Sequence, residues 1–81
     1  MDNPEIDKCG NKRWYNENGK LHREDGPAFE RCDGRKVWWV NGKKHRIDGP
    51  AIECADGSKE YWINGKRYDS LEAGLMDLAL E

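Results

Sequence analysis

The chain has 81 residues and a formal net charge of −2, with 37% charged and 36% apolar residues. This length predicts one domain (1–81) with a thin core, and the four Trp, three Tyr and one Phe argue against the disorder that so polar a composition favours. No apolar run approaches bilayer length, the polar N-terminal stretch predicts no secretory signal, and three cysteines favour a reducing compartment, so we expect a cytoplasmic protein without membrane contact.

A short sequence recurs with a fixed spacing of 23 residues. Asn18-Gly19-Lys20 returns at 41–43 and at 64–66, and Asp25-Gly26-Pro27-Ala28 returns at 48–51. A fixed period in this range is typical of repeat proteins, whose units bury their apolar surface only against their neighbours. The spacing predicts three repeats, at 2–24, 25–47 and 48–70.

Each repeat is predicted to form a β-hairpin with a short extension. Turn-forming pairs such as Asp33-Gly34 and Asn41-Gly42 separate segments rich in aromatic and branched side chains. In chain order we expect strands at 4–8, 12–17, 27–32, 35–40, 50–55 and 58–63, with extensions at 20–22, 43–45 and 66–68. The predicted fold is mainly β, an antiparallel β-meander of three 23-residue hairpin repeats with a short C-terminal capping helix.

The last segment, 70–80, changes to helical spacing. Its regularly spaced apolar positions are Leu71, Leu75 and Leu78. Asp69 begins an acidic capping box, whereas Gly74 weakens a helix by about 1 kcal/mol relative to Ala. We therefore expect a helix that depends on docking, and we expect it to lie nearest Trp62.

Alternation along the strands assigns the side chains to two faces. Two columns of aligned positions are apolar in every repeat and are assigned to the core face: Tyr15, Trp38 and Tyr61, and Ile6, Phe29 and Ile52. Trp39 and Trp62 are aligned with each other, and with Asn16 in the first repeat, on the opposite face. Large apolar groups on a second face need a cover or a partner, and we expect Trp39 to stay partly exposed.

Two histidines each precede an aspartate by three residues. His22 with Asp25, and His45 with Asp48, combine groups that serve in acid–base catalysis or in metal sites. No metal-ligand spacing supports that interpretation, so we favour hydrogen bonds that tie the turns between repeats. No nucleophile motif or phosphate-binding loop accompanies them, and we expect no enzymatic activity.

The cysteines allow a similar choice. Together with the two histidines, Cys9, Cys32 and Cys54 would supply enough ligands for zinc, but these ligands are scattered along the sequence. We interpret the cysteines as buried small apolar side chains, and we expect no metal and no cofactor.

The string W-x-x-N-G-K-x-H-R-x-D-G-P-A at 38–51 resembles tandem repeats of small proteins from bacteriophages and large DNA viruses, and is similar to MORN-type β-hairpin repeats. The resemblance covers residues 2–70. It departs from the MORN pattern where Lys12, Arg35 and Ser58 replace a glycine, and the third repeat has Tyr68 and Asp69 in place of His-Arg. The resemblance implies a scaffold or binding surface without activity, encoded by a phage or virus and present in the host cytoplasm.

The middle repeat is basic, with six basic and three acidic residues at 25–47. The cations are Arg31, Arg35, Lys36, Lys43, Lys44 and Arg46. Interleaved with Trp38 and Trp39, they would suit a single-stranded nucleic acid. A solvated surface of mixed charge, with lysines protecting strand edges, is the plainer interpretation.

We predict a non-enzymatic protein-binding module that binds and inhibits a host defence or regulatory protein. The expected contact residues, of types that are enriched in interface hot spots or that surround them, are Trp39, Trp62, Lys43, Lys44, Arg46 and Arg35. The alternative is an RNA or single-stranded DNA binder that uses the middle repeat. A third class is a structural component or homo-oligomer that pairs through its open sheet edges.

Overall fold

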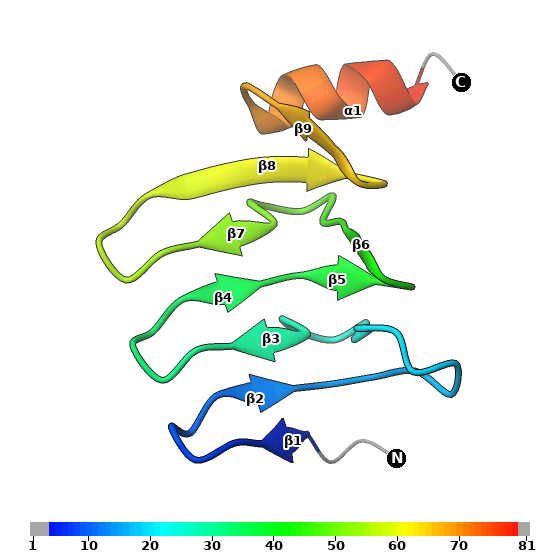
Figure 1. Cartoon of the computed structure of the whole chain (residues 1–81). Helices are drawn as coiled ribbons and strands as arrows, with labels where there is room; N and C mark the ends of the chain where they lie inside the picture. Colours follow the sequence, from blue (N-terminus) through cyan, green and yellow to red (C-terminus); the bar gives the residue numbers. More distant parts are fainter. Residues whose placement is uncertain (1–3, 80–81) are drawn as a thin grey trace.

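The computed structural model describes residues 4–79, which form an antiparallel β-sheet, an adjoining two-stranded ladder and one helix at the C-terminal end (Figure 1). The principal extents of 41 × 31 × 16 Å reflect a molecule only one sheet thick over most of its area. The elements are β1 (Glu5–Ile6), β2 (Lys12–Arg13), β3 (Phe29–Glu30), β4 (Lys36–Val37), β5 (Trp39–Val40), β6 (Lys43–Lys44), β7 (Ile52–Glu53), β8 (Lys59–Ile63), β9 (Lys66–Tyr68) and α1 (Leu71–Ala79).

The strands form an antiparallel meander. The main sheet has the order β1-β2-β3-β4-β7-β8-β9, and β5 pairs with β6 in a second, two-stranded ladder. Figure 1 shows that β5 continues the line of β4, so the two ladders belong to one surface. The predicted mainly β fold, with antiparallel strands and a short C-terminal helix, is confirmed, although most strands are shorter than the sequence suggests.

The Asn-Gly pairs at 41–42 and 64–65 form the turns of two tight hairpins. Asn41 and Gly42 have φ values of 52° and 81°, and Val40 pairs with Lys43 across them. Asn64 and Gly65 repeat this arrangement, with φ values of 54° and 83°. Positive φ at both central residues is the requirement of a two-residue type I′ turn, which asparagine and glycine meet at little steric cost.

The first hairpin has a longer turn than the other two. The backbone oxygen of Asn16 accepts a hydrogen bond from the Gly19 amide, and the Asn16 amide donates to the backbone oxygen of Lys20. The loop between these two residues therefore has three residues, 17–19. The side-chain Oδ1 of Asn16 also accepts from the amides of Asn18 and Lys20, at 2.9 and 3.0 Å. The extra residue shifts everything before this turn by one position relative to the 23-residue spacing.

This shift corrects the alignment of the aromatic columns. The amide of Trp14 donates to Ala28 at 2.8 Å, as the amide of Trp38 donates to Ala51 at 2.7 Å. Trp14, and not Tyr15, therefore occupies the position of Trp38. Tyr15 occupies the position of Trp39, and the expected equivalence of Asn16 with Trp39 was wrong.

The most buried side chains are small or aliphatic rather than aromatic. Ala28 and Ala51 have no exposed surface, and Val37, Ile52 and Ile63 are at most 4% exposed. Trp38, which we expected to be buried, is half-buried, because a single-layer sheet leaves solvent beside both of its faces. Ile6 is 59% exposed and lies on β1, the edge strand of the described sheet. Glu5, and not Ile6, shares the face of Phe29 through Arg13, so the expected place of Ile6 in the core column was wrong.

Each of the Asn-Gly hairpins has a long arm before its turn, such as β4 with β5, and a shorter return arm after it, such as β6. Backbone hydrogen bonds join the return arm of one hairpin to the long arm of the next. Arg23 donates its amide to Trp39 at 3.1 Å, and Gly42 donates to Leu21 at 2.8 Å. One hairpin later, Arg46 donates to Trp62 at 3.0 Å, and Gly65 donates to Lys44 at 2.9 Å.

Helix α1 covers the last hairpin, but not on the expected face. The Ser70 hydroxyl caps it by accepting from the Ala73 amide at 3.2 Å, one residue later than the predicted cap. Gly74 is its buried residue, and a Cβ there would lie 2.7 Å from Cδ1 of Ile63 and 3.1 Å from the Tyr68 ring. The absence of a side chain thus allows close packing on the face of Ile63. As expected, α1 packs against the strand that contains Trp62, since it contacts β8 and β9. It does not cover the Trp62 side chain, however, because Trp62 points to the opposite face from Ile63.

Candidate functional site

Neighbouring residues of the long arms point to opposite faces of the sheet, which we call the Trp38 face and the Trp39 face. Side chains of paired residues share a face. Phe29 pairs with Val37 and Val37 with Ile52, while Trp39 pairs with Lys44. Val37 and Trp39 are two residues apart on one arm, so all of these side chains belong to the Trp39 face. The expectation that Phe29 and Ile52 share a core face with Trp38 was therefore wrong, because the two columns lie on opposite faces.

A shallow groove of about 470 Å³ lies on the Trp39 face. Its apolar lining consists of Leu21, Phe29, Val37, Trp39 and Ile52. Its remaining lining residues are the cations Arg13, Arg31, Arg35 and Lys44, with no acidic residue among them. This is a pronounced local excess of positive charge in a chain whose formal net charge is −2.

Lys44 lies between the two tryptophans of this face. Its Nζ is 4.3 Å from the centroid of the Trp62 ring and 5.7 Å from that of Trp39, within the range of cation–π attraction. The indole Nε1 of Trp62 donates to Oε1 of Glu60 at 3.1 Å. Arg67, the pairing partner of Trp62, lies 4.0 Å from the same carboxylate oxygen.

The four groove cations differ in how far their charge is already neutralised. Arg13 forms an ion pair with Asp7 at 3.1 Å and lies 5.1 Å from the Phe29 ring centroid. Arg31 forms one with Asp33 at 3.1 Å. Within residues 4–79, neither Arg35 nor Lys44 forms an ion pair.

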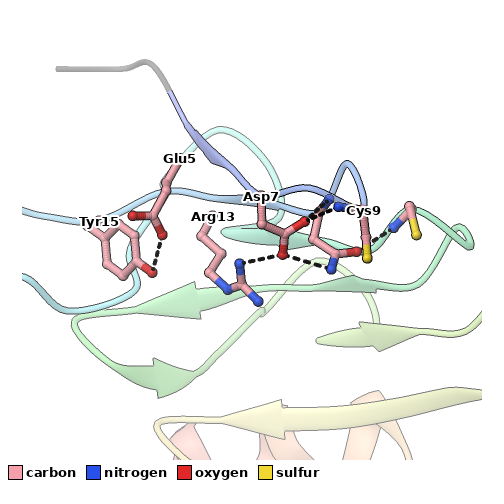
Figure 2. A network of polar contacts seen from close by, with 7 residues as sticks. Glu5, Asp7, Cys9, Arg13 and Tyr15 are labelled. Atoms are coloured by element: carbon pink, nitrogen blue, oxygen red, sulfur yellow. Dashed lines mark hydrogen bonds and ion pairs between the residues drawn. The ribbon is translucent and has the colours of Figure 1, made fainter.

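Asp7 holds the N-terminal end of the groove in a compact network (Figure 2). It accepts from the amides of Cys9 and Asn11, each at 3.0 Å, from the Asn11 side chain at 3.0 Å and from Arg13 at 3.1 Å. The side-chain bond from Asn11, supported by the other donors and opposed by burial, lowers the pKa of Asp7 to about 2. The carboxylate is therefore firmly ionised at neutral pH and fixes Arg13 in place.

Tyr15 is the N-terminal aromatic residue of this face. Its hydroxyl donates to Oε1 of Glu5 at 3.3 Å (Figure 2), and burial, followed by the charge of Glu5, raises the pKa of the phenol. The sequence alignment missed Tyr15 because the longer first turn displaces it by one position. The Tyr15–Glu5 pair thus extends the line of aromatic positions from Trp62 and Trp39 to the first hairpin.

The Trp38 face is organised by arginine. The Arg46 guanidinium lies 3.9 Å from the Trp38 ring centroid, and its Nε donates to Asp48 at 2.8 Å. Its Nη1 donates to the backbone oxygen of Pro50 at 3.0 Å and to Glu53 at 3.1 Å. The bond from Arg46 and its charge lower the pKa of Asp48.

The same arrangement occurs one hairpin earlier. Arg23 lies 3.9 Å from the Trp14 ring centroid and binds Asp25, the oxygen of Pro27 and Glu30 at 3.0, 3.1 and 3.4 Å. A Cβ at Gly49 would lie 2.8 Å from Cζ of Arg46, and one at Gly26 would lie 3.0 Å from Cζ of Arg23. The recurring H-R-x-D-G-P-A-x-E string is therefore explained by a stacked, fully bonded arginine that fills the turn between hairpins.

The histidines bind backbone of the following hairpin. Nδ1 of His22 accepts from the Asn41 amide at 3.0 Å, and Nδ1 of His45 accepts from the Asn64 amide at 2.9 Å. The prediction that the histidines tie hairpins by hydrogen bonds is confirmed. The aspartates contribute differently from the expectation, since Asp25 and Asp48 bind the adjacent arginines.

The cysteines are less buried than predicted. Cys9 and Cys32 are exposed and Cys54 is half-buried. The interpretation as buried side chains was wrong for the first two, because both lie in hairpin turns at the margin of a thin sheet. Within residues 4–79, no group of three or more His, Cys, Asp or Glu side chains is arranged to hold a metal ion.

The structure divides the six predicted contact residues between the two faces. Arg35, Trp39, Lys44 and Trp62 lie together on the Trp39 face. Arg46 belongs to the bonded network of the Trp38 face. Lys43 pairs with Val40, which points to the same side as Trp38, and its aliphatic stem passes 3.7 Å from the position of a Cβ at Gly65.

No helix in the described range 4–79 is both long enough and apolar enough to cross a membrane. Comparison with protein-family models, with curated proteins and with solved structures finds no match to this chain. The candidate site therefore stands on its own geometry.

Proposed function

We propose that the chain is a non-enzymatic protein-binding module whose contact surface is the Trp39 face. The observation that carries this proposal is the groove of about 470 Å³, which combines Trp39 with four other apolar side chains and four cations and contains no acidic lining residue. Aromatic anchors bordered by cations are the usual composition of interface hot spots. The opposite face offers less, because its arginines are already bonded to carboxylates and backbone oxygens.

A protein partner fits this face better than a single-stranded nucleic acid. Sequence-independent binding of bases relies on aromatic rings that are free to stack. Lys44 already lies over the rings of both Trp39 and Trp62, and Trp62 is further held by Glu60. The half-buried side chains of Leu21 and Phe29 give the groove an apolar surface that suits an apolar side chain.

Nucleic acid remains the second candidate because of one specific observation. Arg35 and Lys44 form no ion pair within residues 4–79, and unpaired cations are the groups that contact phosphates. The resemblance to repeats of phage and viral proteins supports a protein of an infected host as the partner, and the proposal that binding inhibits this partner has the same basis.

The two candidates are separated by affinity capture with matched variants. Immobilised wild-type chain is incubated with host lysate, with and without nuclease, beside the variants Arg35→Ala and Lys36→Ala. These neighbours lose the same charge on opposite faces, since Arg35 lines the groove and Lys36 does not.

We expect one protein to be retained after nuclease treatment, lost with Arg35→Ala and kept with Lys36→Ala. Recovery that disappears with nuclease would support the nucleic-acid candidate. Equal recovery of the captured protein by both variants would show that the Trp39 face does not take part in binding.

A further inference from the structure

We propose that the groove binds an acidic protein segment in extended conformation, with an apolar side chain between two carboxylates. This inference rests on the proposed function and specifies the chemistry of the partner. Its starting point is charge complementarity. The chain as a whole is acidic, with a net charge of −2, yet its groove has four cationic and no acidic lining residues.

Two of the groove cations are available to a partner. Arg13 and Arg31 are held by Asp7 and Asp33, so a ligand would have to compete with an existing carboxylate. Arg35 and Lys44 have no such partner within residues 4–79. An arginine that meets a carboxylate in two parallel hydrogen bonds gives both strength and orientation.

The strand spacing places these groups in a defined order. Arg35, Val37 and Trp39 are alternate residues of one nearly continuous arm and share a face, so each is about 7 Å from the next. Lys44 pairs with Trp39 and marks the far end of the line. Because Val37 and Ile52 are at most 4% exposed, the apolar surface open to a ligand here is that of the half-buried Phe29 and Trp39 rings. The face therefore presents a cation, this apolar surface, and a second cation beside Trp39.

An extended ligand with side chains of alternating direction has the same period. Its pattern would be acid–x–apolar–x–acid, with the first carboxylate at Arg35 and the second at Lys44. The apolar side chain would lie above the buried Val37 and against the ring of Phe29, the pairing partner of Val37. The Trp39 ring would cover part of the apolar side chain. Each carboxylate would gain a charge-assisted bond without displacing an acid of the chain itself.

The direct test is a titration with a short, terminally blocked peptide in which one serine separates a central leucine from a glutamate on each side. Amide and indole shifts of the isotope-labelled full chain report the binding site. Control peptides carry glutamine in place of both glutamates, or serine in place of the leucine.

We expect shifts that centre on Val37, Trp39 and Lys44, and affinity that falls at least about tenfold for each control peptide. Arg35→Ala and Lys44→Ala should each weaken binding at least about fivefold, whereas Lys36→Ala should leave it unchanged. Binding should also weaken steeply at about 1 M salt, where exposed charges are screened.

Several results would overturn the inference. They are equal affinity for the glutamine peptide, shifts confined to the Trp38 face, no binding at all, or a short oligothymidine that binds the same residues more tightly than the peptide. If a captured partner still depends on Arg35 while the peptide fails, the chemistry proposed here is wrong and the protein-binding function stands. If capture is also independent of Arg35, the proposed function fails as well.

Discussion

Trp38 and Trp39 are neighbours in sequence, yet their surroundings differ in one decisive respect. Both are half-buried, and both have a cation over the ring. The cation over Trp38 is Arg46, whose guanidinium makes bonds to Asp48, Pro50 and Glu53. The cation beside Trp39 is Lys44, which has no carboxylate partner within residues 4–79. A tryptophan with a cation over its ring is thus a fully bonded structural unit on one face, and on the other face it leaves the charge of the cation without a carboxylate partner within residues 4–79.

This difference shows how the two faces of a single-layer sheet can serve different purposes, one structural and one for binding. A thin sheet has no interior in which to hide large side chains, so each face must either satisfy its own polar groups or leave them for a partner. The Trp38 face satisfies them with the H-R-x-D-G-P-A-x-E string and with helix α1. Within residues 4–79, helix α1 does not cover the Trp39 face, on which Arg35, Trp39 and Lys44 are only half-buried. The proposed function rests on these groups.

The largest effect on stability is expected when Trp38 and Trp39 are replaced by alanine, one at a time. Trp38→Ala should lower the free energy of unfolding by about 3 kcal/mol, the lower end for truncating a large aromatic residue, because Arg46 loses its stacking surface. Trp39→Ala should cost about 1 kcal/mol, because no comparable network depends on it. Urea unfolding monitored by circular dichroism measures both. Equal losses would erase the proposed distinction between the faces.

Arginine and lysine should not be interchangeable on the Trp38 face. Arg46→Lys should cost about 1.5 kcal/mol, because a lysine cannot maintain the divergent bonds to Asp48 and the Pro50 oxygen. Lys44→Arg is the matched exchange on the other face and should be nearly neutral in thermal unfolding. A neutral Arg46→Lys would show that the guanidinium network contributes little.

The bond from histidine to the next hairpin can be tested with an isosteric acceptor. His45→Ala removes the acceptor of the Asn64 amide and should cost about 1 kcal/mol. His45→Asn keeps an oxygen near the position of Nδ1 and should restore most of the loss. Hydrogen exchange of the Asn64 amide reports the bond itself. Unchanged protection in His45→Ala would contradict the assignment.

The smallest effect is expected at Asp7, which neutralises Arg13 at the end of the groove. Because its folded pKa is lowered to about 2 from 3.8, its contribution to stability is present above about pH 4 and is lost as the pH falls towards 2. Asp7→Asn should remove this part of the acid dependence. NMR titration of the carboxyl resonance checks the value, and a midpoint near 4 would mean that the network of Figure 2 is weak in solution.

The sequence predicts the hairpins well because their turns are local. Asn41-Gly42 requires only its own φ values, and the helical spacing of the last segment is equally short-ranged. The alignment of the first hairpin failed for a physical reason. The Asn-Gly-Lys string keeps its period of 23, while the extra residue in the turn after Asn16 shifts Trp14 and Tyr15 by one position. Spacing alone does not locate such an insertion.

The candidate site was predictable only as far as strand alternation extends. Alternation places Arg35, Val37 and Trp39 together, and it correctly separates Trp39 from Trp38. It does not reveal that Arg46 reaches Glu53 and the Pro50 oxygen, since those contacts depend on how the chain crosses between hairpins. The face of helix α1 was missed for a similar reason, because Gly74 packs against Ile63 by a close approach that no spacing encodes.

The most direct test of the division between the faces is the affinity of the captured partner for Trp39→Ala, measured at a temperature at which circular dichroism shows the variant folded. We predict a loss of at least about 2 kcal/mol, the hot-spot threshold, which corresponds to about 30-fold weaker binding. Wild-type affinity of the folded Trp39→Ala chain, together with a large loss of its stability, would contradict the account and would make Trp39 a structural residue like Trp38.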